Sequence, residues 1–184
     1  MYCDCILGRA GFQTGYIPVY LISTVFVLAA LAVLVGTAVW GYRQQEFLRL
    51  NQRGAEALRT GDFAGAEGAF RAALDLRPTQ HTLRLNLGTS LEAQGKWAEA
   101  AAEYGEVLRE NRSPKVDLYR QRCLCAAGDF RQPLTWIFDY RLSHPQDREA
   151  VLAEGECRLR SGDVEGAVGL LEHAVALGAG PQAE

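Results

Sequence analysis

A short phrase that starts with glycine recurs at an almost constant interval, and it limits the possible folds more than any other feature. The phrase begins at Gly61, Gly95, Gly128 and Gly162, so successive copies are separated by almost the same length of chain. Each copy separates two amphipathic stretches of helical length, and glycine supplies the backbone freedom that a tight turn needs. A fixed period of this size is typical of stacked repeats. The sequence therefore predicts an all-α array of about four helix–turn–helix units.

Small residues at matching positions indicate how the two helices of a unit pack together. They are Gly54, Gly88 and Gly155 in the first helices and Ala66, Ala100 and Ala167 in the second helices. Larger apolar residues follow at a constant offset, namely Phe70, Tyr104, Ile137 and Leu171. We expect the small residues to let the two backbones approach closely and the larger ones to fill the space between layers.

These residues resemble the tetratricopeptide repeat family over about residues 47–181, divided into units 47–80, 81–113, 114–147 and 148–181. The first unit carries Gly54, Ala57, Gly61, Phe63, Ala66, Phe70, Ala73 and Pro78 at the family's marked positions. The second carries Leu87, Gly88, Leu91, Gly95, Trp97, Ala100 and Tyr104. The resemblance implies a TPR-type α-solenoid that binds protein partners.

The third unit departs most from this pattern. Gln121 stands where a close-packing glycine is expected, and Pro133 replaces the small alanine. The same helix holds Trp136, Phe138 and Tyr140, which either fill space in an irregular unit or form an aromatic anchor patch for a partner.

In this family ligands lie along the face built from first helices, and helical spacing predicts which residues line it here. They are Asn51, Leu58, Arg59, Leu85, Thr89, Glu92, Leu118, Arg122, Leu152, Glu156, Leu159 and Arg160. The branch that grips acidic C-termini of heat-shock chaperones uses Lys and Asn at fixed positions, and only Arg122 is comparable, so that activity is not carried over. An apolar line with charges of both signs beside it suits an amphipathic helix or an extended peptide, although it could equally be a packing line between repeats.

The N-terminal part of the chain has a different character. No Asp, Glu, Lys or Arg lies between Arg9 and Arg43. We predict a short tail over 1–16, a transmembrane helix over 17–42, a junction over 43–46 and a C-terminal tail over 182–184. The apolar run is longer than the roughly 7–15 residues typical of a cleaved signal peptide, although Gly36-Thr37-Ala38 is an acceptable cleavage site. The junction contains no Gly or Pro, so the helix is expected to continue into the first repeat.

Charge and cysteines bear on membrane orientation. Four arginines follow the apolar run closely, namely Arg43, Arg49, Arg53 and Arg59, against Arg9 before it, which favours cytoplasmic repeats. Five cysteines, Cys3, Cys5, Cys123, Cys125 and Cys157, show no framework spacing and are interpreted as small apolar residues in a reducing compartment. Anchored repeat proteins that face the periplasm are the alternative.

The last unit stops without a polar capping helix, so some of its apolar residues must face outward. Val168 and Val175 are candidates for an end face through which copies of the chain associate. This end either is tolerated as a modest apolar patch or supports a self-assembling scaffold.

Composition excludes several function classes. The net charge of −3 is spread without basic blocks, which argues against nucleic-acid binding. The three histidines are isolated, and no phosphate loop or nucleophile motif is present, so no cofactor, metal or enzymatic activity is expected. We expect a membrane-anchored protein–protein interaction scaffold, acting as adaptor, assembly factor or accessory subunit of a membrane complex. The alternatives are a periplasm-facing chaperone-like module of envelope or cytochrome biogenesis, or a self-assembling scaffold.

Overall fold

The computed structural model describes residues 19–178, and all of its regular structure in that range is helical. The chain forms two compact units, one up to Gln44 and one from Gln45 onward. The predicted tails 1–16 and 182–184 lie outside the described residues, as do the first two residues of the predicted 17–42 segment.

Helix α1 covers Val19–Thr60, including the predicted junction 43–46. From Val25 to Val39 its large apolar side chains are exposed, several by more than half of their surface. Within the described range it is the one helix that is long and apolar enough, by length and composition, to cross a membrane. A signal sequence near an N-terminus would meet the same criterion.

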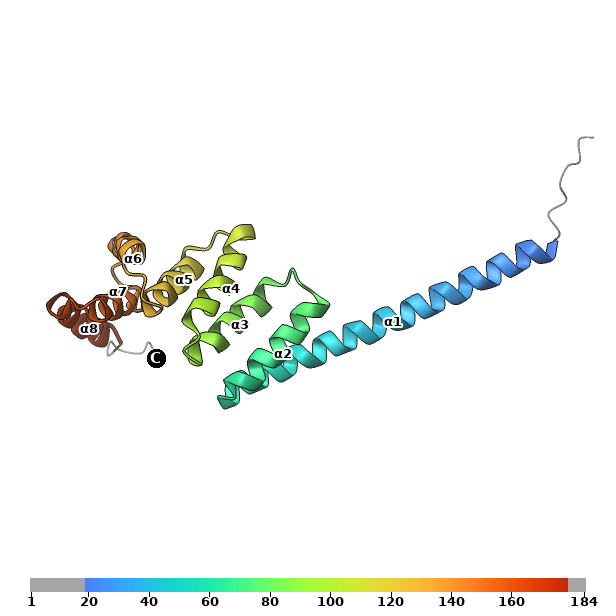
Figure 1. Ribbon diagram of the computed structural model, residues 1–184, viewed down its shortest axis with the longest axis horizontal. Helices are drawn as coiled ribbons and strands as arrows, with labels where there is room; N and C mark the ends of the chain where they lie inside the picture. The colour runs from blue at the N-terminus through green and yellow to red at the C-terminus, as the bar shows by residue number, and fades with distance from the viewer. Residues whose placement is uncertain (1–18, 179–184) are drawn as a thin grey trace, which may run out of the picture. The chain divides into compact units, whose positions relative to one another are not determined.

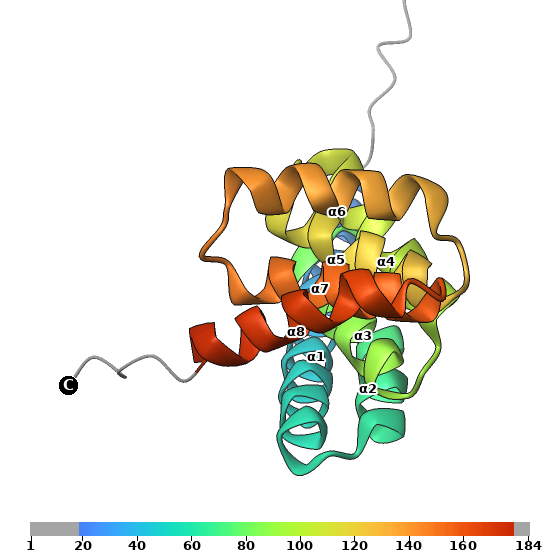
Figure 2. The ribbon, with the colours of Figure 1, turned by 90° about the vertical axis from the view of Figure 1, so that its left-hand side faces the viewer.

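Seven further helices stack as antiparallel neighbours in the second unit (Figure 1). Their bounds are α2 Phe63–Leu76, α3 His81–Ala93, α4 Trp97–Glu110, α5 Pro114–Ala126, α6 Arg131–Ser143, α7 Arg148–Arg160 and α8 Val164–Gly178. Helix α5 packs against α4, α6 and α7, and α8 packs against α7. Figure 2 shows this array from the end formed by α7 and α8. Each of the four predicted repeat ranges contains two helical segments.

The four recurring glycines occupy the turns between paired helices. Their φ angles are 80° at Gly61, 75° at Gly95, 101° at Gly128 and 92° at Gly162, and no other described residue has a positive φ. This left-handed conformation disfavours a side chain with Cβ, which explains why glycine recurs there. The predicted role of the phrase in each turn is therefore confirmed.

The small residues inside the helices provide the expected close contacts. A Cβ atom at Gly54 would lie 2.6 Å from the Phe70 ring, and one at Gly88 would lie 2.6 Å from the Tyr104 ring. In the fourth unit, Gly155 has the same relation to Leu171, at 2.9 Å. The members of each pair are separated by the same length of chain, so the same contact between first and second helices recurs in three units.

The third unit makes this contact differently. Gln121 replaces the glycine and is buried, and its side-chain amide donates a hydrogen bond of 2.9 Å to Asp117 on the same helix. Pro133 and Ile137 are buried on α6. A polar side chain thus fills the position that a bare backbone occupies elsewhere, and its hydrogen bond offsets the cost of burying the amide.

Candidate protein-binding groove

The first helices of the last three units enclose a cavity of about 270 Å³, called the groove cavity below. Its lining comes from α3, the start of α4, α5 and α7: Glu92, Trp97, Arg122, Cys125, Ala126, Ala153, Glu156, Cys157 and Arg160. Four of these residues were predicted to line the ligand face, namely Glu92, Arg122, Glu156 and Arg160. The structure therefore brings a third of the predicted groove residues together in one cavity.

An internal ion pair joins two walls of the groove cavity. The Arg122 guanidinium on α5 donates to the Glu92 carboxylate on α3. The Tyr104 hydroxyl donates to the same carboxylate at 3.2 Å, and burial raises the pKa of Tyr104 well above its usual range. Arg122 also lies 5.5 Å from the centre of the Tyr119 ring. Both charges are therefore already engaged within the protein.

The outer edge of the groove cavity carries two exposed charges of opposite sign. Glu156 and Arg160 lie one turn apart on α7. The Arg160 guanidinium lies 5.6 Å from the centre of the Trp97 ring, across the cavity, and Glu156 lies within electrostatic range of Arg122. Neither charge forms a close ion pair with any residue between 19 and 178. These two side chains are thus accessible to a ligand that lies over the cavity.

A disulfide bond forms part of the cavity wall. Cys125 on α5 and Cys157 on α7 are bonded, with their Cα atoms 5.4 Å apart. The interpretation of this pair as unbonded apolar residues was wrong, and its use as support for a cytoplasmic domain no longer holds. Cys123 remains free and buried, and burial raises the pKa of its thiol to about 12.

A spacing rule could have identified this pair. Adjacent first helices, including their N-cap residues, contact each other at separations slightly shorter than the repeat: 30 residues for Glu92–Arg122 and 32 for Lys115 and Asp147, the N-cap of α7. The two bonded cysteines are also 32 residues apart. A comparison of Cys125 with Cys123 on the same helix does not reveal this relation, because the bonding partner of Cys125 is Cys157 on the next repeat.

The other predicted groove residues do not form one surface with the cavity. Leu118 is only 1% exposed and packs in the core, so it is not available to a partner. Arg59 is exposed but pairs with Glu56 at 2.6 Å. Thr89 is exposed, and its hydroxyl donates to the backbone of its own helix. Of the remaining five, Asn51, Leu58, Leu85 and Leu152 are half-buried, and Leu159 is exposed.

The predicted aromatic patch on α6 is divided between two faces. Trp136 and Tyr140 stack with ring centres 5.2 Å apart, and both pack against the core around Leu118 and Ile137. Phe138 lies on another face of the helix and is exposed, with Arg141 5.5 Å from its ring. The three rings therefore do not form a single anchor patch, because residues two apart on a helix point in divergent directions.

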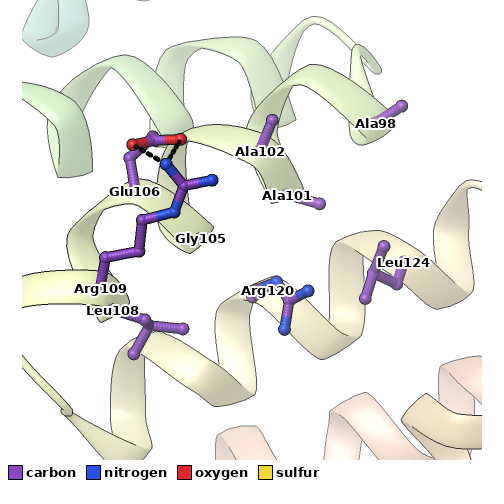
Figure 3. Close-up of a pocket in the computed structure, with 9 residues that line it drawn as sticks. All are labelled: Ala98, Ala101, Ala102, Gly105, Glu106, Leu108, Arg109, Arg120 and Leu124. Carbon is purple, nitrogen blue, oxygen red and sulfur yellow. Dashed lines mark hydrogen bonds and ion pairs between the residues drawn. The ribbon is translucent and has the colours of Figure 1, made fainter.

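A second depression lies between α4 and α5, on residues outside the groove cavity (Figure 3). Its volume is about 580 Å³, and Ala98, Ala102 and Gly105 form much of its lining. Its acidic residue, Glu106, pairs with Arg109 one turn away at 2.9 Å, as the dashed lines show. Its lining residues come from only two helices, whereas those of the groove cavity come from three successive units.

Two further predictions concern the C-terminal unit and metal binding. Val168 and Val175 on α8 are 49% and 66% exposed, so both side chains are accessible on the end face, while association through them stays a prediction. Among residues 19–178 no group of His, Cys, Asp and Glu could hold a metal ion.

Comparison with known proteins supports the fold. Residues 51–115 match the family model described as "Tetratricopeptide repeat". A tetratricopeptide repeat protein from Parabacteroides merdae is similar in structure, with a TM-score of 0.56 and 20% identity over 75% of this chain and 56% of that one. YrrB, described as a TPR protein with an unusual peptide-binding site, has a TM-score of 0.61 and 18% identity over 86% and 81%.

MamA MSR-1 is also similar, with a TM-score of 0.56 and 16% identity over 78% of this chain and 91% of that one. No protein of curated function matches the chain. This chain thus spans little more than half of the first of these structures, and the likeness concerns the fold. The described helices form a tetratricopeptide-repeat-type α-solenoid, and the match at residues 51–115 supports its assignment to the tetratricopeptide repeat family.

Proposed function

We propose that this protein is a membrane-anchored interaction module whose repeat array binds a segment of a partner protein. The observation that carries the proposal is the groove cavity, which three successive units line and which carries two exposed charged side chains at its rim. The likeness to YrrB, itself described as having a peptide-binding site, supports this reading. The module binds rather than catalyses, and no cofactor enters the proposal.

Membrane anchoring is supported by the exposed apolar surface of α1. Side chains such as Phe26, Leu34 and Val35 are each more than 60% exposed. An apolar helix of this length is stabilised when lipid surrounds its side chains. The partner is then a membrane protein or a protein that assembles at the bilayer, and the module acts as adaptor, assembly factor or accessory subunit.

Site-specific photo-crosslinking in cells tests the groove. A photoreactive amino acid at Glu156 or Arg160, the two exposed residues at the rim of the groove cavity, would face a bound segment, whereas the same amino acid at Ala102 faces the pocket between α4 and α5. We expect one discrete adduct from the first two positions and none from the third. Equal labelling from all three positions would refute the groove as the binding surface.

A second candidate is a chaperone-like module that faces the periplasm. The Cys125–Cys157 disulfide favours it, because disulfides persist mainly outside the reducing cytoplasm. The arginines after the apolar run favour the opposite orientation. Protease accessibility of a tag after Glu184, in intact cells and in inverted vesicles, separates the two. Digestion only in inverted vesicles would support a cytoplasmic array and exclude the periplasmic candidate.

A further inference from the structure

The walls of the groove cavity are mainly polar, and their charges balance. Four of its nine lining residues are charged, namely Glu92, Arg122, Glu156 and Arg160. Glu92 and Arg122 neutralise each other in a direct ion pair. Glu156 and Arg160 have opposite signs, and neither forms a close ion pair within residues 19–178. The cavity therefore offers a ligand one free carboxylate acceptor and one free guanidinium donor, both on α7.

This lining disfavours an occupant that is apolar or that carries a single charge. An apolar group would exclude water from Glu156 and Arg160 and leave both without a hydrogen-bond partner, which costs more than the apolar contact contributes. A cation would be repelled by Arg160, and an anion by Glu156. The occupant that satisfies both side chains is neutral and carries a hydrogen-bond donor and an acceptor together.

The size of the cavity selects among neutral groups of this kind. Glu156 and Arg160 lie one turn apart, about 6 Å along α7, and two hydrogen bonds of about 2.9 Å to one small group bridge that separation. A hydroxyl replaces a single water, with a share of roughly 30 Å³, and would leave most of the 270 Å³ unfilled.

A side-chain carboxamide is larger than a hydroxyl and presents both functions on one edge. Its oxygen accepts and its nitrogen donates, so it can bond to a guanidinium and a carboxylate at the same time. The apolar part of the lining, which includes Trp97, Ala126 and Ala153, suits the methylene stem of such a side chain. The cavity thus matches Asn or Gln in both parts of the side chain.

We propose that the groove cavity is a carboxamide pocket that takes one Asn or Gln side chain from the partner segment. This inference rests on the proposed function. The amide nitrogen donates to the Glu156 carboxylate, and the Arg160 guanidinium donates to the amide oxygen. Only the amide side chain enters the cavity, so the pocket sets no requirement on the residues beside it.

Selection from a random library of short peptides, against the full chain in lipid nanodiscs, tests the proposal. Enriched peptides should share one Asn or Gln. In a synthetic peptide of that sequence, a near-isosteric apolar residue (Leu for Asn, Met for Gln) should weaken binding at least about tenfold, because it loses both hydrogen bonds. The corresponding acid, Asp or Glu, should weaken it as much, because it cannot donate and is repelled by Glu156. Undiminished binding of either replacement would overturn the carboxamide pocket.

Charge changes on α7 locate the amide. Glu156→Arg removes the acceptor and should weaken the peptide at least about tenfold, whereas Glu172→Arg, on an exposed site of α8 outside the cavity, should leave affinity within about twofold. Adding Arg160→Glu to Glu156→Arg restores one charge of each sign. Because an amide can turn by 180° about its last torsion and exchange its donor and acceptor, this double variant should recover most of the lost affinity. No recovery would contradict an amide occupant.

The outcomes separate this inference from the proposed function. Peptides that bind the array without any requirement for Asn or Gln would overturn the carboxamide pocket while leaving an interaction module. If no peptide is selected but crosslinked adducts form at Glu156 or Arg160, this inference fails and the proposed function stands. The absence of both refutes both. Circular dichroism shows whether the variants retain their helices, and the peptide series on the unmodified chain does not depend on the folding of any variant.

Discussion

The second and third repeats have helices of nearly equal length but are held together by different means. In the second, Gly88 lies against the Tyr104 ring, and the buried residues of both helices are almost all apolar. In the third, Gln121 takes the place of that glycine. Several specific cross-links instead join the third unit to the fourth: the Cys125–Cys157 disulfide, the Lys115–Glu149 pair at 3.0 Å and the Arg141–Glu154 pair.

This difference indicates that an irregular unit can be kept in a repeat array by polar and covalent contacts with its neighbour. Close packing depends on shape and tolerates little change in volume. Ion pairs and a disulfide depend on the presence of particular partners, and the loss of one partner leaves the other unpaired. The two repeats should therefore respond to different mutations.

The largest effect is expected at the buried carboxylate of α7. Glu154 has a side chain only 1% exposed and accepts from Arg141 on α6 and from Arg158 at 2.8 Å. Glu154→Gln removes the negative charge between two guanidinium groups and should lower the free energy of unfolding by about 3–5 kcal/mol. Urea denaturation followed by circular dichroism measures this change. The control Glu172→Gln, on an exposed site of α8, should change the free energy of unfolding by no more than about 0.5 kcal/mol. Equal losses in the two variants would show that the ion pairs of Glu154 are not the cause.

Breaking the disulfide should have the next largest effect. The double change Cys125→Ser, Cys157→Ser removes a cross-link across 32 residues and should cost about 2–4 kcal/mol. Hydrogen exchange should accelerate in α5 to α7 more than in α2 to α4. A reductant should reproduce the effect in the unmodified protein and do nothing further to the double variant. Uniform acceleration across all helices would contradict a local role.

A smaller effect is expected from filling the close contact of the second repeat. Gly88→Ala places a methyl group 2.6 Å from the Tyr104 ring, and the strain should cost about 1–3 kcal/mol. Gly68→Ala is the matched control, because no atom lies within 4 Å of its added Cβ and alanine favours a helix by about 1 kcal/mol. Thermal unfolding should show opposite shifts. Destabilisation by both changes would show that the loss does not come from the contact with Tyr104.

The smallest effect concerns acid stability between the first and second repeats. Glu67 accepts from Lys96 at 2.7 Å, Gln94 at 2.9 Å and Arg71 at 3.0 Å, and these hydrogen bonds, led by that of Lys96, lower its pKa from 4.5 to about 2. Its stabilisation is therefore complete above about pH 4.5 and is lost as the pH falls towards 2.

Glu67→Gln should cost about 1–2 kcal/mol at neutral pH and flatten the stability profile between pH 4.5 and 2. Urea midpoints measured across this range provide the test. Glu99→Gln removes a carboxylate that is 55% exposed and has a single ion-pair partner, so it should change the profile much less. An unchanged acid slope in Glu67→Gln would rule out this carboxylate as its source.

Local sequence was sufficient for the repeat architecture. The turn glycines, of which Gly61 and Gly128 are examples, each have a positive φ, and the small residues of the first, second and fourth units make close contacts. These features depend on residues within a single repeat, so their spacing is visible along the chain. The irregularity of the third repeat was equally visible at Gln121 and Pro133.

The groove could be predicted only in part. Helical spacing placed Glu92, Arg122, Glu156 and Arg160 on the correct face, but it also placed Leu118 there, whereas that side chain is buried. Periodicity identifies which way a residue points relative to its own helix. It does not identify how closely the neighbouring helix covers that residue, and this depends on the packing of two repeats.

The sequence by itself determined the helices, the turns between them, the number of repeats and an apolar segment long enough to span a membrane. Only the tertiary structure decided that Cys125 bonds to Cys157, that Arg122 pairs with Glu92 and that Trp97 faces Arg160 across a cavity. The first set follows from hydrogen bonds and turns between residues close in the chain. The second set joins side chains from different repeats, and the offset between adjacent helices, which no local pattern encodes, selects those partners.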